Sequence, residues 1–180
     1  MRLVILLLML IFTLNAFAYQ DAKPVTALIA YGVEARPEEN VDGNIATHEL
    51  TNLAVGAGYG KFVGLLERAT FEESSGNATL NIKRNLEDTM LWIQYRALSW
   101  NYLVPFFGGG VGFYQEKVTT SLLGLSTTNQ SDHKLLGGGN FGISLDVPYV
   151  WLSLEARLLF GDELDRQPTL GGVARVGLYF

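Results

Sequence analysis

Apolar and polar residues alternate with a period of two through most of this chain, and this pattern restricts the chain to β-structure. In 150–160, Leu152 and Leu154 fall on one side of an extended backbone, whereas Glu155 and Arg157 fall on the other. The same alternation runs through 25–36, 50–60, 85–99, 103–116, 134–146 and 169–180. An amphipathic helix would need a period of 3.6, so we expect an all-β chain.

The stretch 61–71 is also expected to form a strand, although the sequence does not define its inward face. Glu67 and Arg68 are adjacent, so either register places a charge on the outer face. With this stretch the chain has eight predicted strands. The links near 58–61, 100–102 and 147–149 are tight, whereas those at 37–49, 72–84, 118–132 and 161–168 are long and polar. This regular alternation of link lengths predicts an eight-stranded antiparallel up-and-down transmembrane β-barrel.

The N-terminus is typical of a cleavable signal peptide. Arg2 supplies a positive charge, an apolar segment follows from Leu3 to Leu14, and Ala16 and Ala18 form a small-x-small cleavage site. The apolar segment is too short to span a bilayer, which needs about 20 residues. We therefore expect residues 1–18 to be removed and residues 19–180 to form one barrel domain.

The polar face of the predicted strands is charged, with both signs present. It carries Glu34, Asp88, Arg96, Glu116, Asp146, Glu155, Arg157 and Arg175. Arg or Lys on a lipid-facing surface at mid-depth costs about 2–4 kcal/mol, so these residues are expected to face inward and to form an ion-pair network in the lumen. Eight strands leave an interior only wide enough for side chains. A wide diffusion pore is therefore not expected.

Aromatic residues gather toward the ends of the predicted strands. Tyr59, Trp100, Tyr102, Phe106, Tyr149, Trp151, Tyr179 and Phe180 fall near the short turns, whereas Phe71, Phe113, Tyr114 and Phe160 fall near the long links. Two such bands predict aromatic girdles at the two membrane interfaces.

Composition excludes several classes of site. The chain has no cysteine, which excludes disulfides, thiolate metal sites and a cysteine nucleophile. Its net charge is −5 and no run of Lys or Arg occurs, so no nucleic-acid partner is expected. The glycine-rich 56–61 departs from a phosphate-binding loop, because Phe62 follows Lys61 where Ser or Thr is needed. We predict no cofactor and no metal.

Four segments resemble those of the small OmpA-type outer-membrane barrel family. They are 104–114 (VPFFGGGVGFY), 137–142 (GGGNFG), 154–157 (LEAR) and 175–180 (RVGLYF). The resemblance implies localisation in the outer membrane of a Gram-negative bacterium after export through the inner membrane. It also implies contact with outer-membrane lipid and lipopolysaccharide, and recognition of the terminal aromatic Phe180 by the outer-membrane assembly machinery.

The function expected from these features is structural or interactive, with the four long links displayed as extracellular loops on a rigid barrel. No catalytic residue is assigned. The acidic pairs at 38–39, 72–73 and 162–163 are expected to be solvated or to touch cation-bridged lipopolysaccharide.

Three alternatives remain open from sequence. One is a lipid A-modifying enzyme that uses His133 with Ser131 and Asp132, although the His-x-Ser-Asn string of one such family is missing. Another is a narrow channel. The third is a soluble, lipocalin-like carrier, which would place its apolar residues inward and its arginines outward.

Overall fold

The computed structural model describes residues 26–39, 45–77, 79–96, 102–161 and 168–180. The predicted signal peptide, residues 1–18, lies outside the described residues. The strands are β1 (Thr26–Glu39), β2 (Ile45–Tyr59), β3 (Phe62–Gly76), β4 (Leu80–Arg96), β5 (Leu103–Leu122), β6 (Leu125–Gln130), β7 (Lys134–Val147), β8 (Val150–Gly161) and β9 (Thr169–Tyr179). No helix among the described residues is long and apolar enough to cross a bilayer.

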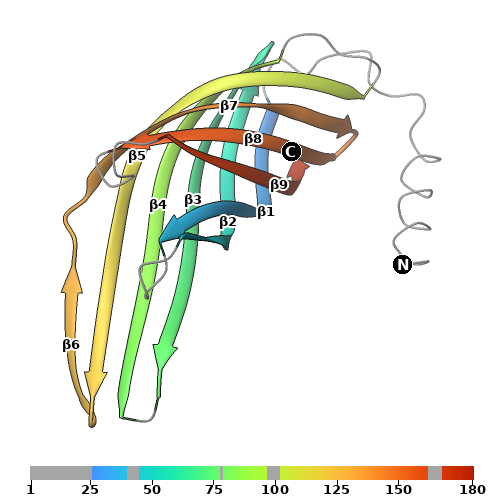
Figure 1. Cartoon of the computed structure of the whole chain (residues 1–180). Coiled ribbons are helices and arrows are strands. Elements are labelled where there is room, and N and C mark those ends of the chain that lie inside the picture. Colours follow the sequence, from blue (N-terminus) through green and yellow to red (C-terminus); the bar gives the residue numbers. More distant parts are fainter. Residues whose placement is uncertain (1–25, 40–44, 78, 97–101, 162–167) are drawn as a thin grey trace.

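Eight of these strands form a closed antiparallel barrel, which confirms the predicted fold class. Strands adjacent in the chain pair with each other, except that β7 pairs with β5 instead of with β6, and β6 pairs with β5 outside the closed wall. Pairing of β1 with β9, from Leu28↔Tyr179 to Ala35↔Gly172, joins the first strand to the last. The barrel wall therefore consists of β1–β5 and β7–β9 (Figure 1).

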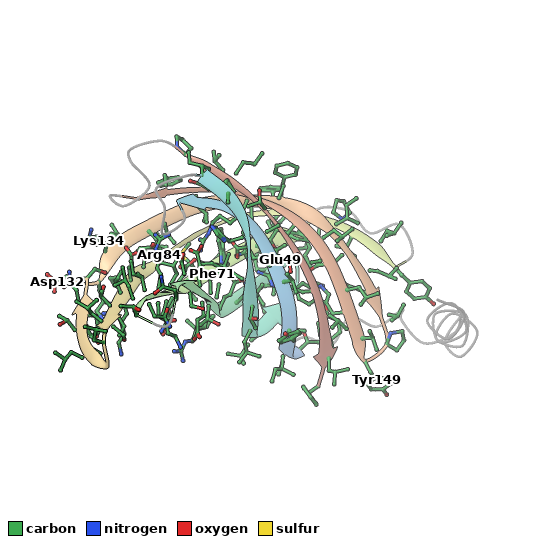
Figure 2. The ribbon with its side chains drawn as sticks, turned by 60° about the horizontal axis from the view of Figure 1, so that its bottom comes forward. Glu49, Phe71, Arg84, Asp132, Lys134 and Tyr149 are labelled. Carbon is green, nitrogen blue, oxygen red and sulfur yellow. The ribbon has the colours of Figure 1, made fainter. Side chains whose placement is uncertain are left out.

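The β2–β3 and β7–β8 turns lie at one end of the barrel, called here the turn end, and the β3–β4 and β5–β6 links lie toward the opposite loop end. The turns at Gly60 and Tyr149 both use a positive φ, of 58° and 69°. Figure 2 shows Tyr149 at the turn end and Asp132 and Lys134 at the loop end.

Two links predicted as loops are largely strand. In 72–84, β3 continues to Gly76 and β4 begins at Leu80. In 118–132, β5 continues to Leu122 and β6 returns from Leu125, so the link is a β-hairpin. The first segment is mainly charged and polar, and the second is rich in Ser and Thr. Apolar and polar residues do not alternate regularly in either segment, so the period of two is not visible in their sequence.

The two faces of the barrel differ in chemistry, as the period of two predicts. Apolar side chains such as Leu154 and Ile143 are exposed on the outer face. Arg157 and Arg175 are buried in the lumen. The soluble-carrier alternative required the opposite facing and is therefore wrong.

The face of β3 that the sequence left open is now defined. Glu67 points into the lumen and is 2% exposed. Arg68 points outward and pairs with Glu87 of β4 across 2.6 Å. Both residues of this outer pair lie among the outward-facing Thr70 and Thr89. These four residues border the apolar belt, the band of outward-facing apolar side chains around the barrel, on its loop-end side.

The predicted aromatic girdles are wrong in part. Tyr59 and Tyr149 are exposed at the turn end, but Phe106 and Trp151 are buried in the lumen. Trp100 lies outside the described residues. Position along a strand was used for the prediction, whereas the alternation of faces decides whether a side chain meets lipid.

Glycines make room for a tryptophan in the lumen. Trp92 is fully buried, and its ring lies against the backbone of Gly110 on β5 and Gly138 on β7. A Cβ atom at position 110 would lie 2.6 Å from ring carbons of Trp92. A side chain larger than that of glycine at either position would therefore overlap the indole.

Substitution of Gly110 tests whether the fit against Trp92, rather than the loss of a glycine as such, determines the stability of the barrel. Gly110→Ala should lower the free energy of unfolding by about 1–3 kcal/mol, because the new methyl group overlaps Trp92. Gly109→Ala is the matched control: it faces outward, its Cβ would lie 3.5 Å from the nearest atom, and it should change stability by less than about 0.5 kcal/mol. Urea titration in lipid vesicles measures both values. Equal losses would contradict this packing.

Candidate functional site

The middle of the lumen is organised around Arg157 of β8. Its guanidinium donates to Glu34 of β1 (Nη1 to Oε2, 2.9 Å), to Glu67 of β3 (Nη2 to Oε2, 2.6 Å) and to Glu155 of its own strand (Nε to Oε1, 2.5 Å). All four side chains are buried. One arginine thus connects three strands of the barrel wall through charge-assisted hydrogen bonds.

Arg175 of β9 shares two of these carboxylates. It donates to Glu155 (Nη1 to Oε2, 2.7 Å), to Asn52 of β2 (Nε to Oδ1, 2.9 Å) and to Glu67. Asn140 and Gln94 also donate to the two Glu155 oxygens, at 3.0 and 3.3 Å. Glu155 is therefore surrounded by donors, which offsets the cost of burying its charge.

Arg36 extends this cluster along the lumen. Its Nη1 lies 2.6 Å from Asp88 Oδ2 of β4 and 3.7 Å from Glu34 Oε1. We call the connected group of Glu34, Arg36, Glu67, Asp88, Glu155, Arg157 and Arg175 the central cluster. It contains four carboxylates and three guanidiniums, so most of its charge is neutralised internally.

An aromatic ring packs against the central cluster. The guanidinium carbon of Arg157 lies 4.7 Å from the centroid of the Trp92 ring. Both side chains are at most 2% exposed, and a cation–π contact is strongest when it is desolvated. The niche formed by Gly110 and Gly138 thus positions the ring that covers the central arginine.

Separate ion pairs lie nearer the two ends of the barrel. Arg96 pairs with Asp146, and the Tyr179 hydroxyl accepts from Arg96 Nη2 at 2.8 Å and lies 3.2 Å from Asp146 Oδ2. At the loop end, Arg84 Nε lies 2.5 Å from Glu116 Oε1, and both side chains are partly exposed. The charged residues therefore occur in two groups in the lumen and in a third where β4 and β5 continue past the closed wall at the loop end.

The eight residues expected from sequence are distributed over these groups. Glu34, Asp88, Glu155, Arg157 and Arg175 belong to the central cluster, whereas Arg96 with Asp146 and Glu116 with Arg84 form the end groups. The lumen residues predicted from sequence did not include Arg36, Glu67 or Arg84. Arg36 follows Glu34 at a spacing of two, which is a usable signal. Glu67 gives none, because its neighbour Arg68 is equally charged.

The histidines do not join these clusters. His48 is half-buried with its ring 4.5 Å from that of Phe71, and His133 is exposed with its ring 6.3 Å from that of Phe113. Ser131 Oγ accepts from the backbone N–H of Glu116 at 2.9 Å. Within the described part of the chain, no hydrogen bond or ion pair joins His133 to Ser131 or Asp132.

Metal binding has no support in the described residues. No group of three or more His, Cys, Asp or Glu side chains among them is placed to hold a metal ion. Of the acidic pairs, Glu72 forms an ion pair with Lys83 across 2.6 Å, and 162–163 lies outside the described residues.

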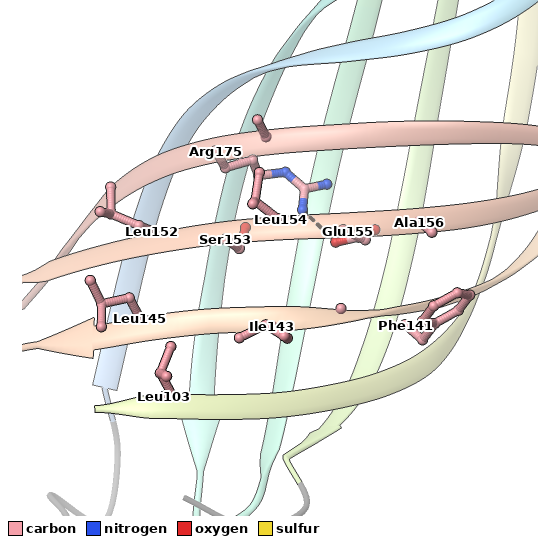
Figure 3. A pocket seen from close by; sticks show the side chains of 12 residues that line it. Leu103, Phe141, Ile143, Leu145, Leu152, Ser153, Leu154, Glu155, Ala156 and Arg175 are labelled. Carbon is pink, nitrogen blue, oxygen red and sulfur yellow. Dashed lines mark hydrogen bonds and ion pairs between the residues drawn. The ribbon is translucent and has the colours of Figure 1, made fainter. Parts of the chain in front are cut away.

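An apolar depression of about 800 Å³ lies on the outer surface of β5, β7, β8 and β9 (Figure 3). Its apolar lining comes from outward-facing side chains that include Leu103, Phe141, Ile143 and Leu154. The buried Glu155–Arg175 pair belongs to the same wall. This depression faces away from the lumen, so it offers an apolar surface rather than a polar binding site.

Comparison with known proteins identifies the fold. No family model and no curated protein matches this chain in sequence. The structure is similar to Ail, the attachment invasion locus protein of Yersinia pestis (TM-score 0.63, 14% identity, 88% of this chain and 100% of that one). It is also similar to Neisserial surface protein A (0.60, 13%, 89% and 98%) and to the N-terminal β-barrel domain of Pseudomonas aeruginosa OprF (0.52, 14%, 89% and 100%). All three are small eight-stranded outer-membrane barrels.

Removal of Glu67 tests the central cluster. Glu67→Ala removes one of the two carboxylates that Arg157 and Arg175 share, and removal of one partner from a buried ion pair typically costs about 3–5 kcal/mol. Glu87→Ala is the matched control, since it breaks the exposed pair with Arg68, and such pairs contribute at most about 1 kcal/mol. Urea unfolding in lipid vesicles compares the two. A Glu67→Ala barrel as stable as Glu87→Ala would contradict the role given to the cluster.

Proposed function

We propose that this protein spans the outer membrane of a Gram-negative bacterium and serves as a rigid scaffold for a surface-interaction region at its loop end. The observation that carries the proposal is the segregation of side chains across one sheet. Arg157 and Arg175 are buried and paired inside, whereas Leu154, Ile143 and Phe141 are more than half exposed outside. Such an exterior is unfavourable in water and favourable in hydrocarbon.

The closure of the barrel and the height of its apolar belt also support a position in the outer membrane. A closed barrel leaves no unpaired backbone edge within the membrane. The outward run on β8 from Leu152 to Phe160 measures about 26 Å along the strand at about 3.3 Å per residue. With a strand tilt of about 40°, its height is about 20 Å, close to the apolar band of outer-membrane barrels. Outer-membrane lipid and lipopolysaccharide are the proposed surroundings of this belt.

The filled lumen favours a scaffold over a transport path. The central cluster and Trp92 are buried together across the middle of the barrel, and eight-stranded barrels have little interior space beyond their side chains. No enzymatic role is proposed, since His133 packs beside Phe113 rather than with a base and a nucleophile.

A role at the cell surface is supported by the loop end and by one similar structure. Recognition sites are commonly held on extensions of a rigid scaffold, and β4, β5 and β6 extend well beyond the barrel (Figure 1). Ail has been crystallised in complex with the heparin analogue sucrose octasulfate. The proposed topology places this extension outside the cell, with residues 1–18 acting as the export signal.

Single cysteines test the topology, because the chain has no cysteine of its own. Ser126→Cys on β6 and Lys61→Cys at the turn end are both at exposed positions. A membrane-impermeant maleimide should label Ser126→Cys on intact cells and Lys61→Cys only after the outer membrane is disrupted. Labelling of Lys61→Cys alone on intact cells, or recovery of the protein in a soluble fraction, would contradict the proposal.

Phe180 is the proposed contact with the assembly machinery. Its side chain is 69% exposed, while its backbone pairs with that of Ala27. Phe180→Ser should therefore keep the barrel intact but reduce the folded protein recovered from outer membranes several-fold.

Heat-dependent gel migration measures the folded fraction of this variant. Phe160→Ser, which removes an outward aromatic at the loop end, is the control and should be recovered in larger amounts. Both proteins should refold equally in detergent without the machinery. A Phe180→Ser defect that persists in detergent would show a loss of stability instead of recognition.

A further inference from the structure

A small sheet projects beyond the barrel at the loop end. Pairing of β2 with β3 ends at Thr51↔Thr70, and pairing of β5 with β7 ends at Tyr114↔Lys134. Beyond these points β3, β4, β5 and β6 continue as four paired strands (Figure 1). From Tyr114 to Leu122, β5 extends about 26 Å past its last contact with β7, at about 3.3 Å per residue.

The far end of this sheet carries four leucines. Leu80, Leu122, Leu123 and Leu125 are 40%, 51%, 77% and 80% exposed, and we call them the leucine tip. Residues paired directly across neighbouring strands form one row of the sheet. Leu80, Leu122 and Leu125 share the first row, and Leu123 lies in the turn beside Gly124. The Leu123 N–H donates to the Thr79 carbonyl at 2.9 Å, which ties the turn of the β5–β6 hairpin to the start of β4. The tip is therefore built from two adjacent hairpins.

The rows behind the tip carry no charge. The second row consists of Gly76, Asn81, Ser121 and Ser126, and the third of Ser75, Ile82, Thr120 and Thr127. Among the described residues, the first charge appears in the fourth row at Lys83, which pairs with Glu72 across 2.6 Å. Three rows correspond to about 10 Å of uncharged sheet at about 3.3 Å per residue.

We propose that the leucine tip inserts into the interface of a second lipid bilayer, one that faces the bacterial surface. This inference rests on the proposed function, because it needs the loop end to lie outside the cell. Apolar groups of interfacial segments penetrate about 5–10 Å into the headgroup and acyl boundary. The uncharged depth of the sheet matches this range. Lys83 and Glu72 then lie at the level of the aqueous phase.

The residues behind the tip fit the headgroup region. Hydroxyls of Ser121, Ser126 and Thr127 are able to donate to phosphate and ester oxygens. The backbone groups on the free edges of β3 and β6 also need polar partners, and the wet interface supplies these, whereas the hydrocarbon core does not. Insertion therefore stops at the interface, with only the leucines in contact with acyl chains.

A bilayer fits the tip better than a protein partner does. Protein interfaces depend on Trp, Tyr and Arg, whereas Leu, Ser and Thr are under-represented among their energetically dominant residues. The described residues of the first three rows include no aromatic side chain and no arginine. Four leucines also fall short of the roughly 800 Å² per partner that a stable protein interface buries. A second copy of this chain is disfavoured for the same reason.

Vesicle binding by the folded protein tests the inference. The barrel is first incorporated into lipid nanodiscs, and flotation with phosphatidylcholine vesicles is then measured against empty nanodiscs. We expect the wild-type discs to float with the vesicles. The combined change Leu123→Ser and Leu125→Ser should weaken this association at least tenfold. The matched control is Ile45→Ser, a residue 81% exposed at the start of β2 and outside the tip, which should leave association unchanged.

Two further readouts complete the test. Association through leucines should persist between 0.1 and 0.5 M salt, and Leu123→Trp should show a blue-shifted emission with vesicles that Ile45→Trp does not show. Absence of wild-type flotation, loss of flotation at high salt, or equal effects of the tip and Ile45 variants would overturn the inference. Failure of the protein to enter nanodiscs would instead count against the proposed membrane barrel itself, before any vesicle is added.

Discussion

The pairing of Arg157 and Arg175 with the carboxylates of Glu67 and Glu155 is the interaction on which this structure depends. Each partner comes from the wall of a lumen that is shielded from bulk water, so a charge without a partner would be strongly unfavourable there. The ion pairs of Glu67 on β3 cross the barrel to Arg157 on β8 and Arg175 on β9. Glu155 connects the same two arginines along β8 and to the neighbouring β9. The cross-section of the barrel is thereby defined by side chains of fixed length.

The exterior follows from the same alternation. Placing the charged residues inside leaves Leu, Ile, Val and Phe outside, and the closed hydrogen-bonding pattern removes the edges that would otherwise be exposed. Trp92 occupies space that Gly110 and Gly138 leave free, so the lumen is packed by large and small residues on facing strands. The proposed surface interaction is therefore assigned to the loop end, where β3, β4, β5 and β6 continue beyond the closed wall.

Much of this architecture could be predicted from sequence, because faces in a strand alternate strictly. Glu34, Glu155 and Arg157 were assigned to the lumen on that basis, and all three are buried. The failures have physical reasons. The prediction for Phe106 and Trp151 used only their position near a strand end. Phe106 lies two residues from Gly108, and Trp151 lies two residues from Ser153, so each shares the inward face of the strand. The hairpin within 118–132 is mostly polar apart from Val118 and the leucines at its turn, so its sequence shows no regular alternation from which a strand register could be predicted.

The partnership of β1 with β9 has a consequence for the order of events in folding. These strands come from opposite ends of the chain, and their pairing completes the cylinder. Contacts of such large sequence separation form slowly, because the loop-closure entropy is lost before the contact stabilises anything. Until β9 is present, β1 and β8 each expose an unpaired edge, and Arg157 lacks its neighbour Arg175. A chain without β9 therefore has no stable smaller barrel to form, and the whole wall closes in one step when β9 pairs with β1 and β8.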